Sequence, residues 1–346
     1  MHRGGVAMLG LLAVGACSDA LEQTTSAGQV VVAVNTVNGT LSLVSVDNRS
    51  VSSVNVPPAG ATPTSVATRG SLVVAPGGNA ATLAVFDFSN GSPPAITTAT
   101  LPANSGATGV AIQSDSIVWV ANPNRNSVTR VNVRTGDTAS AAVGVFPQAV
   151  VVVGGLLYVV NANVVGGTPA GPSWITVLRT ATPSPAFDSI PLTGKNARSA
   201  TLGADGRVYV VNAGTLGGGD GTLSIVDTSS RIEAAVLNGL GESPGPAVYH
   251  PSGRLLVASP TEGILEVSAA TRTLTRGTGQ GVKPGGRGVA ALALDQTGRI
   301  YAFDRGNCTQ PGVLHILTAP PSYDAANPIA VGVCPSAAAT ILVPSL

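Results

Sequence analysis

The chain has 346 residues, of which 44% are hydrophobic, 10% charged and 3% aromatic, and it contains 43 glycines and 25 prolines. The formal net charge is +1, and a nearly neutral chain has no electrostatic surface of the kind that binds nucleic acid. The abundance of Val, Thr, Ser and Gly favours many short strands joined by tight turns. We therefore expect an all-β protein without a nucleic-acid partner.

The N-terminus has the pattern of a secretory signal. Arg3 supplies a positive charge, residues 6–14 form a short apolar run, and the run ends in Val14-Gly15-Ala16-Cys17. Such a segment is too short to span a bilayer. An aliphatic residue, two small residues and a cysteine resemble the lipobox of bacterial lipoproteins. The resemblance implies that residues 1–16 are a cleaved signal peptide and that Cys17 carries a lipid.

The residues after the cysteine extend this interpretation. Residues 17–28 are then a lipidated cysteine and a polar tether, and the chain contacts the membrane only through its anchor. Ser18 rather than Asp follows Cys17, which in a bacterium with two membranes implies the outer membrane. The alternative is an ordinary secretory peptide with an incidental cysteine. Either interpretation places the mature protein in the cell envelope or outside the cell.

The chain contains three cysteines. An odd number is awkward in an oxidising compartment, but a lipid on Cys17 leaves Cys308 and Cys334 to form a pair. We predict a disulfide between them, which would close a loop of about 26 residues and by the loop-entropy estimate contribute about 3 kcal/mol. The alternative is two unpaired, buried thiols.

A short β-rich strand recurs along the chain after residue 29. Each copy ends at an asparagine or an equivalent position, and a turn and a second, alternating strand follow it. Taking positions 35, 76, 122, 161, 212, 259 and 304 as equivalent, the steps between copies are 41, 46, 39, 51, 47 and 45 residues. This spacing is typical of one four-stranded propeller blade. The seven copies are residues 30–35, 72–76, 117–122, 157–161, 208–212, 255–259 and 300–304.

The two ends of the repeat array complement each other. From the second copy on, a further short strand precedes each copy and joins it through a Gly-containing turn, such as Asp205-Gly206-Arg207. The first copy has no such strand, whereas residues 337–343 form a strand-like segment left over at the C-terminus. We therefore expect the C-terminal strand to become the innermost strand of the N-terminal blade. This arrangement closes the ring and leaves no open sheet edge.

Two copies read Tyr-Val-Val-Asn, at residues 158–161 and 209–212, and the second is followed by Gly-Thr-Leu-Ser-Ile-Val-Asp at 221–227. These segments resemble the YVTN-type β-propeller repeats of bacterial and archaeal surface proteins. The Thr of the signature is Val here, and Pro76 and Ser259 replace the asparagine in two other copies. The resemblance implies one domain, residues 29–346, that is a seven-bladed β-propeller of four-stranded blades. It does not imply one activity, because this architecture carries binding proteins, lactonases and lyases.

Long loops gather on one face of such a propeller. We call this the long-loop face; it consists of the loops between the second and third strands of each blade and those between blades. Four basic residues in the inter-blade loops are expected to approach the channel mouth there and form a small basic funnel for an anionic ligand. Asp220, in a Gly-rich loop, is a further candidate for ligand binding. The four are Lys195, Arg198, Lys283 and Arg287, and their alternative role is that of solvated charges on turns.

Catalytic and metal-binding signals are weak. His250 lies in a hairpin turn and His315 on an alternating strand, and neither has a partner at metal-ligand spacing. Asp220, Glu242 and Asp304 are loop acids that could help hold calcium, although turn formation is the favoured explanation for them. We therefore expect no cofactor and assign no catalytic or metal-ligating residue.

Two functions are consistent with these features. The first is a non-catalytic cell-envelope lipoprotein, monomeric, that binds a protein, peptide or glycan partner through its long-loop face. The second is a lactonase-like hydrolase or lyase that acts at the channel mouth. A cluster of His, Asp and Glu at the mouth would favour the enzyme, and a mouth lined by Ala, Val and Ser would favour the binding protein.

Overall fold

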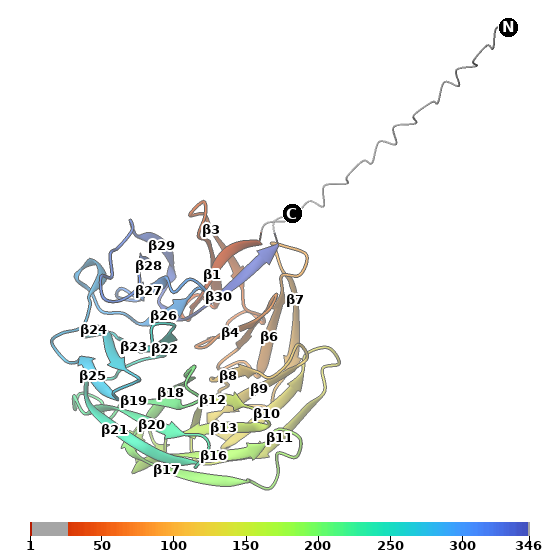
Figure 1. Ribbon diagram of the computed structural model, residues 1–346. Coiled ribbons are helices and arrows are strands. Elements are labelled where there is room, and N and C mark those ends of the chain that lie inside the picture. Colours follow the sequence, from red (N-terminus) through yellow and green to blue (C-terminus); the bar gives the residue numbers. More distant parts are fainter. Residues whose placement is uncertain (2–26, 345–346) are drawn as a thin grey trace.

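A computed structural model describes Met1 and residues 27–344. Residues 27–344 form seven four-stranded antiparallel sheets, which radiate from a central axis as the blades of a propeller (Figure 1). The described residues contain no α-helix, only two single 3₁₀ turns, η1 (Pro123–Arg125) and η2 (Pro284–Gly286). The predicted all-β, seven-bladed propeller is confirmed.

Each blade has its innermost strand at the axis and its outermost strand at the rim (Figure 1). In blade 4 a small hairpin, β14 (Val164–Val165) and β15 (Thr168–Pro169), extends the loop between the second and third strands. From the axis outward the strands are β30 (Pro335–Pro344), β1 (Ala27–Asn35), β2 (Thr40–Ser45) and β3 (Val51–Asn55) in blade 1; β4 (Ala67–Arg69), β5 (Leu72–Pro76), β6 (Thr82–Asp87) and β7 (Ala95–Thr100) in blade 2; β8 (Val110–Ile112), β9 (Ile117–Asn122), β10 (Ser127–Asn132) and β11 (Thr138–Ala142) in blade 3; β12 (Pro147–Val153), β13 (Leu156–Asn161), β16 (Pro172–Arg179) and β17 (Asp188–Lys195) in blade 4; β18 (Ala197–Leu202), β19 (Val208–Asn212), β20 (Gly221–Asp227) and β21 (Ile232–Gly241) in blade 5; β22 (Ala247–His250), β23 (Arg254–Ser259), β24 (Gly263–Ser268) and β25 (Thr273–Arg276) in blade 6; and β26 (Ala291–Leu294), β27 (Ile300–Asp304), β28 (Pro311–Leu317) and β29 (Ile329–Val333) in blade 7.

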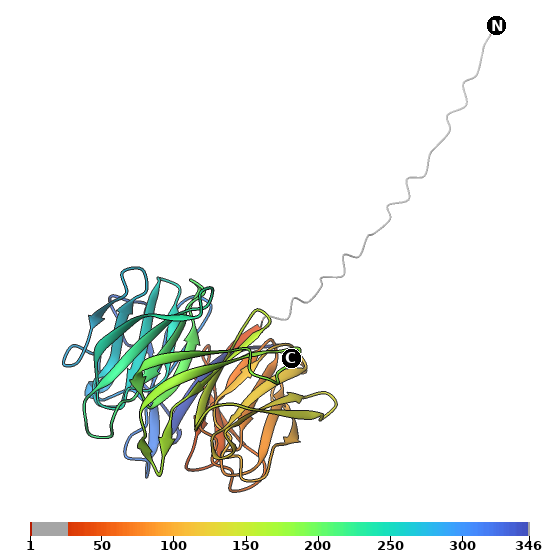
Figure 2. The ribbon, with the colours of Figure 1, turned by 90° about the horizontal axis from the view of Figure 1, so that it is seen from below.

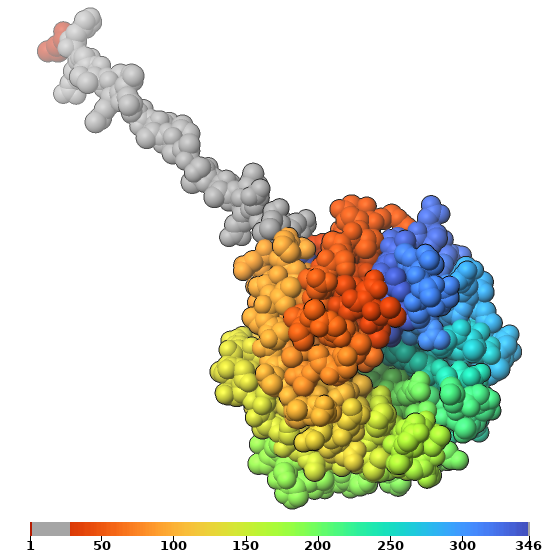
Figure 3. All heavy atoms as spheres, turned by 180° about the vertical axis from the view of Figure 1, so that it is seen from behind, coloured from red at the N-terminus to blue at the C-terminus, as the bar shows by residue number. Residues whose placement is uncertain are grey.

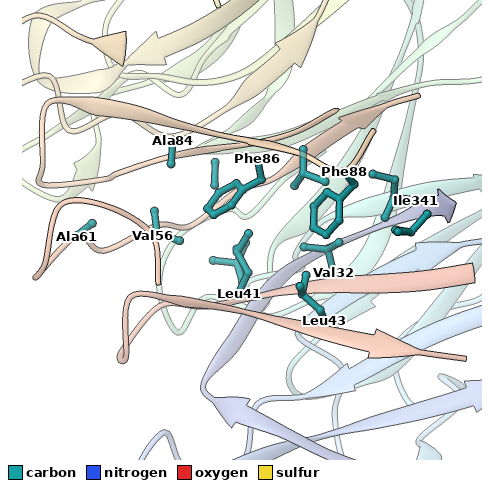
Figure 4. Close-up of a cluster of buried hydrophobic side chains, with 13 residues drawn as sticks. Val32, Leu41, Leu43, Val56, Ala61, Ala84, Phe86, Phe88 and Ile341 are labelled. Carbon is teal, nitrogen blue, oxygen red and sulfur yellow. The ribbon is translucent and has the colours of Figure 1, made fainter. Parts of the chain in front are cut away.

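The seven recurring strands of the sequence are the second strands of the blades. They are apolar at nearly every position because each blade is covered on both faces by its neighbours, and successive side chains of a strand point to opposite faces. On β1, Val32 and Val34 pack against Phe86 and Phe88 of blade 2 (Figure 4), while Val31 and Ala33 pack toward blade 7. The core is therefore a ring of inter-blade layers.

The ring closes in blade 1. β30 pairs antiparallel with β1 along its length, with Val30 opposite Ile341 and Ala27 opposite Pro344. Figure 3 shows the consequence, since the first blade and the last blade of the chain lie in contact. The closure predicted from the sequence is confirmed, and β1 begins at Ala27, two residues before the expected start of the domain, because Ala27 and Gly28 also pair with β30.

The asparagine that ends the second strand is buried in four blades. Asn212 donates from Nδ2 to Ser224 Oγ (2.8 Å) and Thr222 Oγ1 (3.1 Å) on the third strand. Asn35, Asn122 and Asn161 make the corresponding bonds to Ser42, Thr129 and Thr176. This explains why Ser and Thr interrupt the apolar pattern of the third strands at the same place in these four blades, since they accept hydrogen bonds from the buried amide nitrogen.

The strand directions define two faces. Innermost strands begin, and second strands end, at the long-loop face. β1 therefore starts at the opposite face with Ala27, beside the end of β30 at Pro344; Figure 2 gives a view across the blades. No helix in the described residues has the length and hydrophobicity needed to cross a membrane. The predicted signal peptide, Cys17 and most of the tether lie outside the described residues.

Candidate binding site at the mouth of the central channel

All seven blades contribute to a cavity of about 450 Å³ at the long-loop end of the channel. Its wall consists mainly of residues at or just before the start of the innermost strands, from segments such as 64–66 in blade 2 and 336–338 in blade 1. Small residues dominate, mainly Ala, Val, Ser, Thr, Gly and Pro. The volume lies within the range of roughly 300–1,000 Å³ that is usual for small-ligand sites.

Three hydroxyl groups in the wall have protein partners, two of them in the neighbouring blade and one within its own blade. Ser65 Oγ of blade 2 donates to the carbonyl of Thr108 in blade 3, and Ser199 Oγ of blade 5 donates to the carbonyl of Gly245 in blade 6 (3.2 Å). Ser336 Oγ lies 2.6 Å from Thr36 Oγ1. These hydroxyls therefore fix the shape of the cavity and already have partners.

Two arginines, from blades 5 and 7, are the charged residues of this wall. Arg198 sits at an irregularity in the β18–β19 ladder, where Ala197 and Ser199 pair out of step and the extra residue is left without a ladder partner. Arg305 directly follows β27. Both side chains are exposed, and within residues 27–344 neither guanidinium has a hydrogen bond or an ion pair. Two arginines without a protein acceptor for their donors therefore belong to the lining of one cavity.

The predicted disulfide is present beside Arg305. Cys308 and Cys334 are bonded, with their Cα atoms 4.5 Å apart and a sequence separation of 26 residues. Cys334 itself lines the cavity, and Cys308 belongs to the loop that carries Arg305. The bond therefore fastens this loop of blade 7 to the segment that leads into β30.

The other basic residues proposed for a funnel lie elsewhere. Lys195 ends β17 and lies near enough to Asp220 to help lower the pKa of that carboxyl. Lys283 precedes η2 and is exposed. Arg287 lines a different cavity and has its Nε 3.6 Å from Asp304 Oδ2. Of the four, Arg198 alone belongs to the residues that line the channel mouth; their role in ligand binding stays a prediction.

Asp220 closes its own loop. Its carboxylate accepts hydrogen bonds from the backbone nitrogen of Thr215 (2.7 Å) and from Thr215 Oγ1 (3.2 Å). The backbone bond is the main reason why the pKa of Asp220 lies below its usual value. These contacts give Asp220 a structural part in shaping the loop of blade 5.

The second cavity, about 450 Å³, lies on the long-loop side of blade 7. It is lined by Arg287, Asp304 and His315. Asp304 also accepts a hydrogen bond from the backbone nitrogen of Gly306 (2.8 Å). Burial lowers the pKa of His315 and so favours the neutral imidazole, and the charge of Asp304 opposes this only in part.

The acids considered for calcium are dispersed over three blades. Among the described residues, no group of three or more His, Cys, Asp or Glu side chains is arranged to hold a metal ion. Glu242 is exposed on the loop after β21. His250 links two turns. Its Nδ1 lies 2.7 Å from Ser252 Oγ in its own turn, and its Nε2 lies 2.9 Å from the carbonyl oxygen of Gly298. The positions of Asp220, Glu242 and Asp304 give no support to calcium binding, which stays a prediction.

Sequence reasoning missed Arg305. The sequence did contain a signal, because Arg305 directly follows the seventh second strand and the loop after that strand belongs to the long-loop face. The four basic candidates all came from inter-blade loops, whereas Arg305 lies in a loop between second and third strands. The lesson is that both kinds of loop on this face supply residues to the channel mouth.

The fold and the cavity define the chain as a seven-bladed β-propeller with an open site at its channel mouth. No protein-family model matches the sequence, and no curated protein sequence matches it. The YVTN resemblance therefore stays a prediction.

Solved structures share the architecture. A protein of unknown function from Desulfotomaculum acetoxidans is 14% identical, with a TM-score of 0.66 over 90% of this chain and 98% of that one. A hydrazine synthase chain from Kuenenia stuttgartiensis is 14% identical, with a TM-score of 0.64 over 82% of this chain and 90% of that one. Virginiamycin B lyase from Staphylococcus aureus is 13% identical, with a TM-score of 0.60 over 81% of this chain and 92% of that one. At such low identity these likenesses show the fold alone.

Proposed function

We propose that this chain is a non-catalytic lipoprotein of the cell envelope that binds a protein, peptide or glycan partner through its long-loop face. The observation that carries the proposal is the cavity at the channel mouth. All seven blades build it, its wall is composed mainly of small residues, and it presents two arginines with unpaired donors.

The chemistry of the wall favours binding over catalysis. General acid–base catalysis uses a side chain that gains or loses a proton near the working pH, most often His, Glu or Asp. The described lining of the channel mouth contains none of these residue types. The alternative, a lactonase-like hydrolase or lyase, would need such a group within reach of a substrate in the channel mouth.

Exposed apolar side chains also favour this face as the contact surface. Among residues 27–344, the three most exposed large apolar side chains are Leu216 (82%), Val165 (60%) and Val37 (59%). All three lie in loops between second and third strands, and these loops project from the long-loop face. A partner that covers the channel mouth would bury them and gain the hydrophobic free energy of that contact.

The proposed anchor is consistent with presentation of this face. β1 begins at Ala27 on the opposite face, and the ten residues from Cys17 to Ala27 span at most about 35 Å. A lipid on Cys17 would therefore hold the opposite face toward the membrane. The long-loop face would then point away from the membrane, toward a partner in the adjoining space.

The test uses the full-length chain with an affinity tag after Leu346. The chain is expressed in its native cells, crosslinked, and purified from solubilised envelope. We expect wild-type protein to retain a discrete envelope component and the Val165→Ser/Leu216→Ser variant to lose it. The matched control is Ile232→Ser, because Ile232 is 55% exposed but begins β21 at the opposite face.

Two results would contradict the proposal. One is recovery of the same component by wild type and by the long-loop variant. The other is recovery of no component in any sample, with all proteins folded. Turnover of ester or lactone substrates by the purified chain would favour the hydrolase or lyase instead.

A further inference from the structure

We infer that the channel-mouth cavity is an anion site, in which Arg198 and Arg305 together hold a carboxylate or phosphate group. The inference rests on the proposed function in one respect, since it takes this anion to be part of the partner. The site itself can be tested without knowing that partner.

The two arginines line the same cavity from different blades. Arg198 comes from the innermost strand of blade 5 and Arg305 from the loop after the second strand of blade 7. Between these blades, residues 243–248 of blade 6 form the intervening wall of the same cavity. A group that enters the mouth beside blade 6 therefore meets one arginine on each side.

The charges of this cavity are not balanced by the protein. Some arginines elsewhere are paired with acids, as in Arg299 with Asp295 (2.7 Å) and Arg207 with Asp205 (3.0 Å). The described wall of the channel mouth has two positive side chains and no acidic one. Arginine stays charged in proteins and offers a planar set of donors that matches the oxygens of a carboxylate or phosphate. An anion bound there would balance the two positive charges and accept hydrogen bonds from their donors.

The remaining wall makes the arginines the main source of affinity. The hydroxyls of Ser65 and Ser199 are already engaged between blades and that of Ser336 within blade 1, so they have less to offer a ligand. Small apolar residues supply much of the other surface. A cavity of about 450 Å³ has room for the C-terminus of a peptide or for another compact anionic group. An extended surface with many negative charges would contact only the rim of the cavity.

The disulfide gives Arg305 a fixed position. Cys308 lies three residues beyond Arg305 and is bonded to Cys334, which lines the same cavity. Holding the loop in place before binding lowers the conformational entropy that a ligand must remove. We therefore treat the disulfide as a positioning element for this site, and we expect its reduction to weaken anion binding.

The test measures binding of three probes to the full chain by calorimetry at low salt. The probes are inorganic phosphate, N-acetyl-Ala-Ala with a free carboxylate, and the same dipeptide as its C-terminal amide. We expect at least one anionic probe to bind and the neutral amide not to bind. Arg198→Ala and Arg305→Ala should each weaken binding at least about tenfold, and added salt should weaken it further because it screens the charges.

The matched control is Arg125→Ala. Arg125 is exposed on the same face, in the loop after β9. Its substitution removes one positive charge, as the other two substitutions do, but leaves the described lining of the cavity unchanged. We expect the control to bind as wild type does. Binding of phosphate alone would indicate a phosphate-bearing partner group, and binding of the dipeptide alone would indicate a peptide C-terminus.

Two outcomes would overturn the inference. One is that neither anionic probe binds the folded chain, and the other is that binding survives both arginine substitutions. These outcomes are separate from failure of the proposed function. If wild type and the Arg198→Ala/Arg305→Ala variant retain a partner equally, the anion site is overturned and the proposed function stands. If the chain binds an anion but no envelope partner is recovered, the proposed function is overturned and the anion site stands.

Discussion

The hydroxyl of Tyr323 in blade 7 donates a hydrogen bond to the carboxylate of Glu266 in blade 6. Glu266 is 2% exposed, and it also accepts hydrogen bonds from Arg254 and Thr275. Tyr323 lies in the loop between β28 and β29, so this contact fastens an irregular loop of one blade onto the outer part of its neighbour. It lies away from the channel and contributes to stability alone.

Removing the tyrosine hydroxyl should therefore destabilise the fold without affecting ligand binding. Tyr323→Phe takes one donor from a buried carboxylate, and we expect a loss of about 1–2 kcal/mol in the free energy of unfolding. Urea denaturation measures it. Tyr249→Phe is a useful control because it removes a hydroxyl for which the structure gives no hydrogen bond, and an equal loss in both variants would contradict the assignment.

Stability should fall in acid through two buried carboxyls. Burial alone would raise the pKa of Glu266 and of Asp295, but hydrogen bonds from Tyr323 to Glu266 and from Thr297, Arg299 and Tyr301 to Asp295 outweigh it and lower both values. A carboxyl with a lowered pKa in the folded state stabilises that state above its unfolded pKa and loses this contribution as pH falls through the folded value.

The relevant pH window begins at the ordinary values of 4.5 for Glu and 3.8 for Asp. We expect the urea midpoint of the wild type to be level near neutrality and to drop below that range. Glu266→Gln should be less stable at pH 7 but show a shallower drop in acid, since one of the titrating groups is gone. Parallel pH profiles for the two proteins would exclude Glu266 as a source of the acid sensitivity.

Deleting residues 335–346 should expose an open edge. The deletion removes β30, and the backbone groups of β1 that pair with it would then be free to pair with another chain. It also removes Ile341 and Val343 from the layer between blades 1 and 2 (Figure 4). We expect aggregation on size-exclusion chromatography, whereas removal of residues 345–346 alone should leave a monomer. A folded, monomeric truncated protein would refute the closure.

Reduction of the disulfide should lower stability. A bond that closes a loop of 26 residues restricts the unfolded chain, and the loop-entropy estimate gives about 3 kcal/mol. Thermal unfolding with and without reductant measures the effect. Cys308→Ser/Cys334→Ser should unfold at the lower temperature in both conditions, and a response of this variant to reductant would point to another cause.

A methyl group at position 194 should disturb blade 5. A Cβ on Gly194 would lie 2.2 Å from Cγ of Asn212, whose amide is buried and bonded to the third strand. Gly194→Ala should therefore cost about 1–3 kcal/mol as an overpacked site. Gly155→Ala is the matched control because a Cβ there would meet no atom within 4 Å. Equal unfolding midpoints for the two variants would contradict this packing.

Local patterns were sufficient to predict the fold. The residues at 30–35 and 208–212 are apolar on both sides of the strand, which is expected only where a sheet is covered on both faces. Their regular recurrence predicts the number of blades. The closure followed from counting strands at the two ends, and the disulfide followed from cysteine number and compartment, so neither required knowledge of side-chain positions.

The site was less predictable for a physical reason. Whether a loop cation reaches the channel depends on the path of an irregular backbone and on competing partners, and neither has a periodic signature. Arg287, in the loop between blades 6 and 7, lies beside Asp304 at the end of β27. Arg198 reaches the cavity through a local irregularity in its ladder. The contact of Tyr323 with Glu266 is likewise formed by a loop that no strand pattern positions.

The sequence by itself therefore determined the architecture of this protein: seven blades, the strand that closes the ring and the two cysteines that pair. These features depend on alternation, spacing and count, which the linear chain displays directly. Only the tertiary structure decided which charges meet at the channel mouth. Arg198 and Arg305 are 107 residues apart in the sequence, and they line one cavity because seven blades converge there.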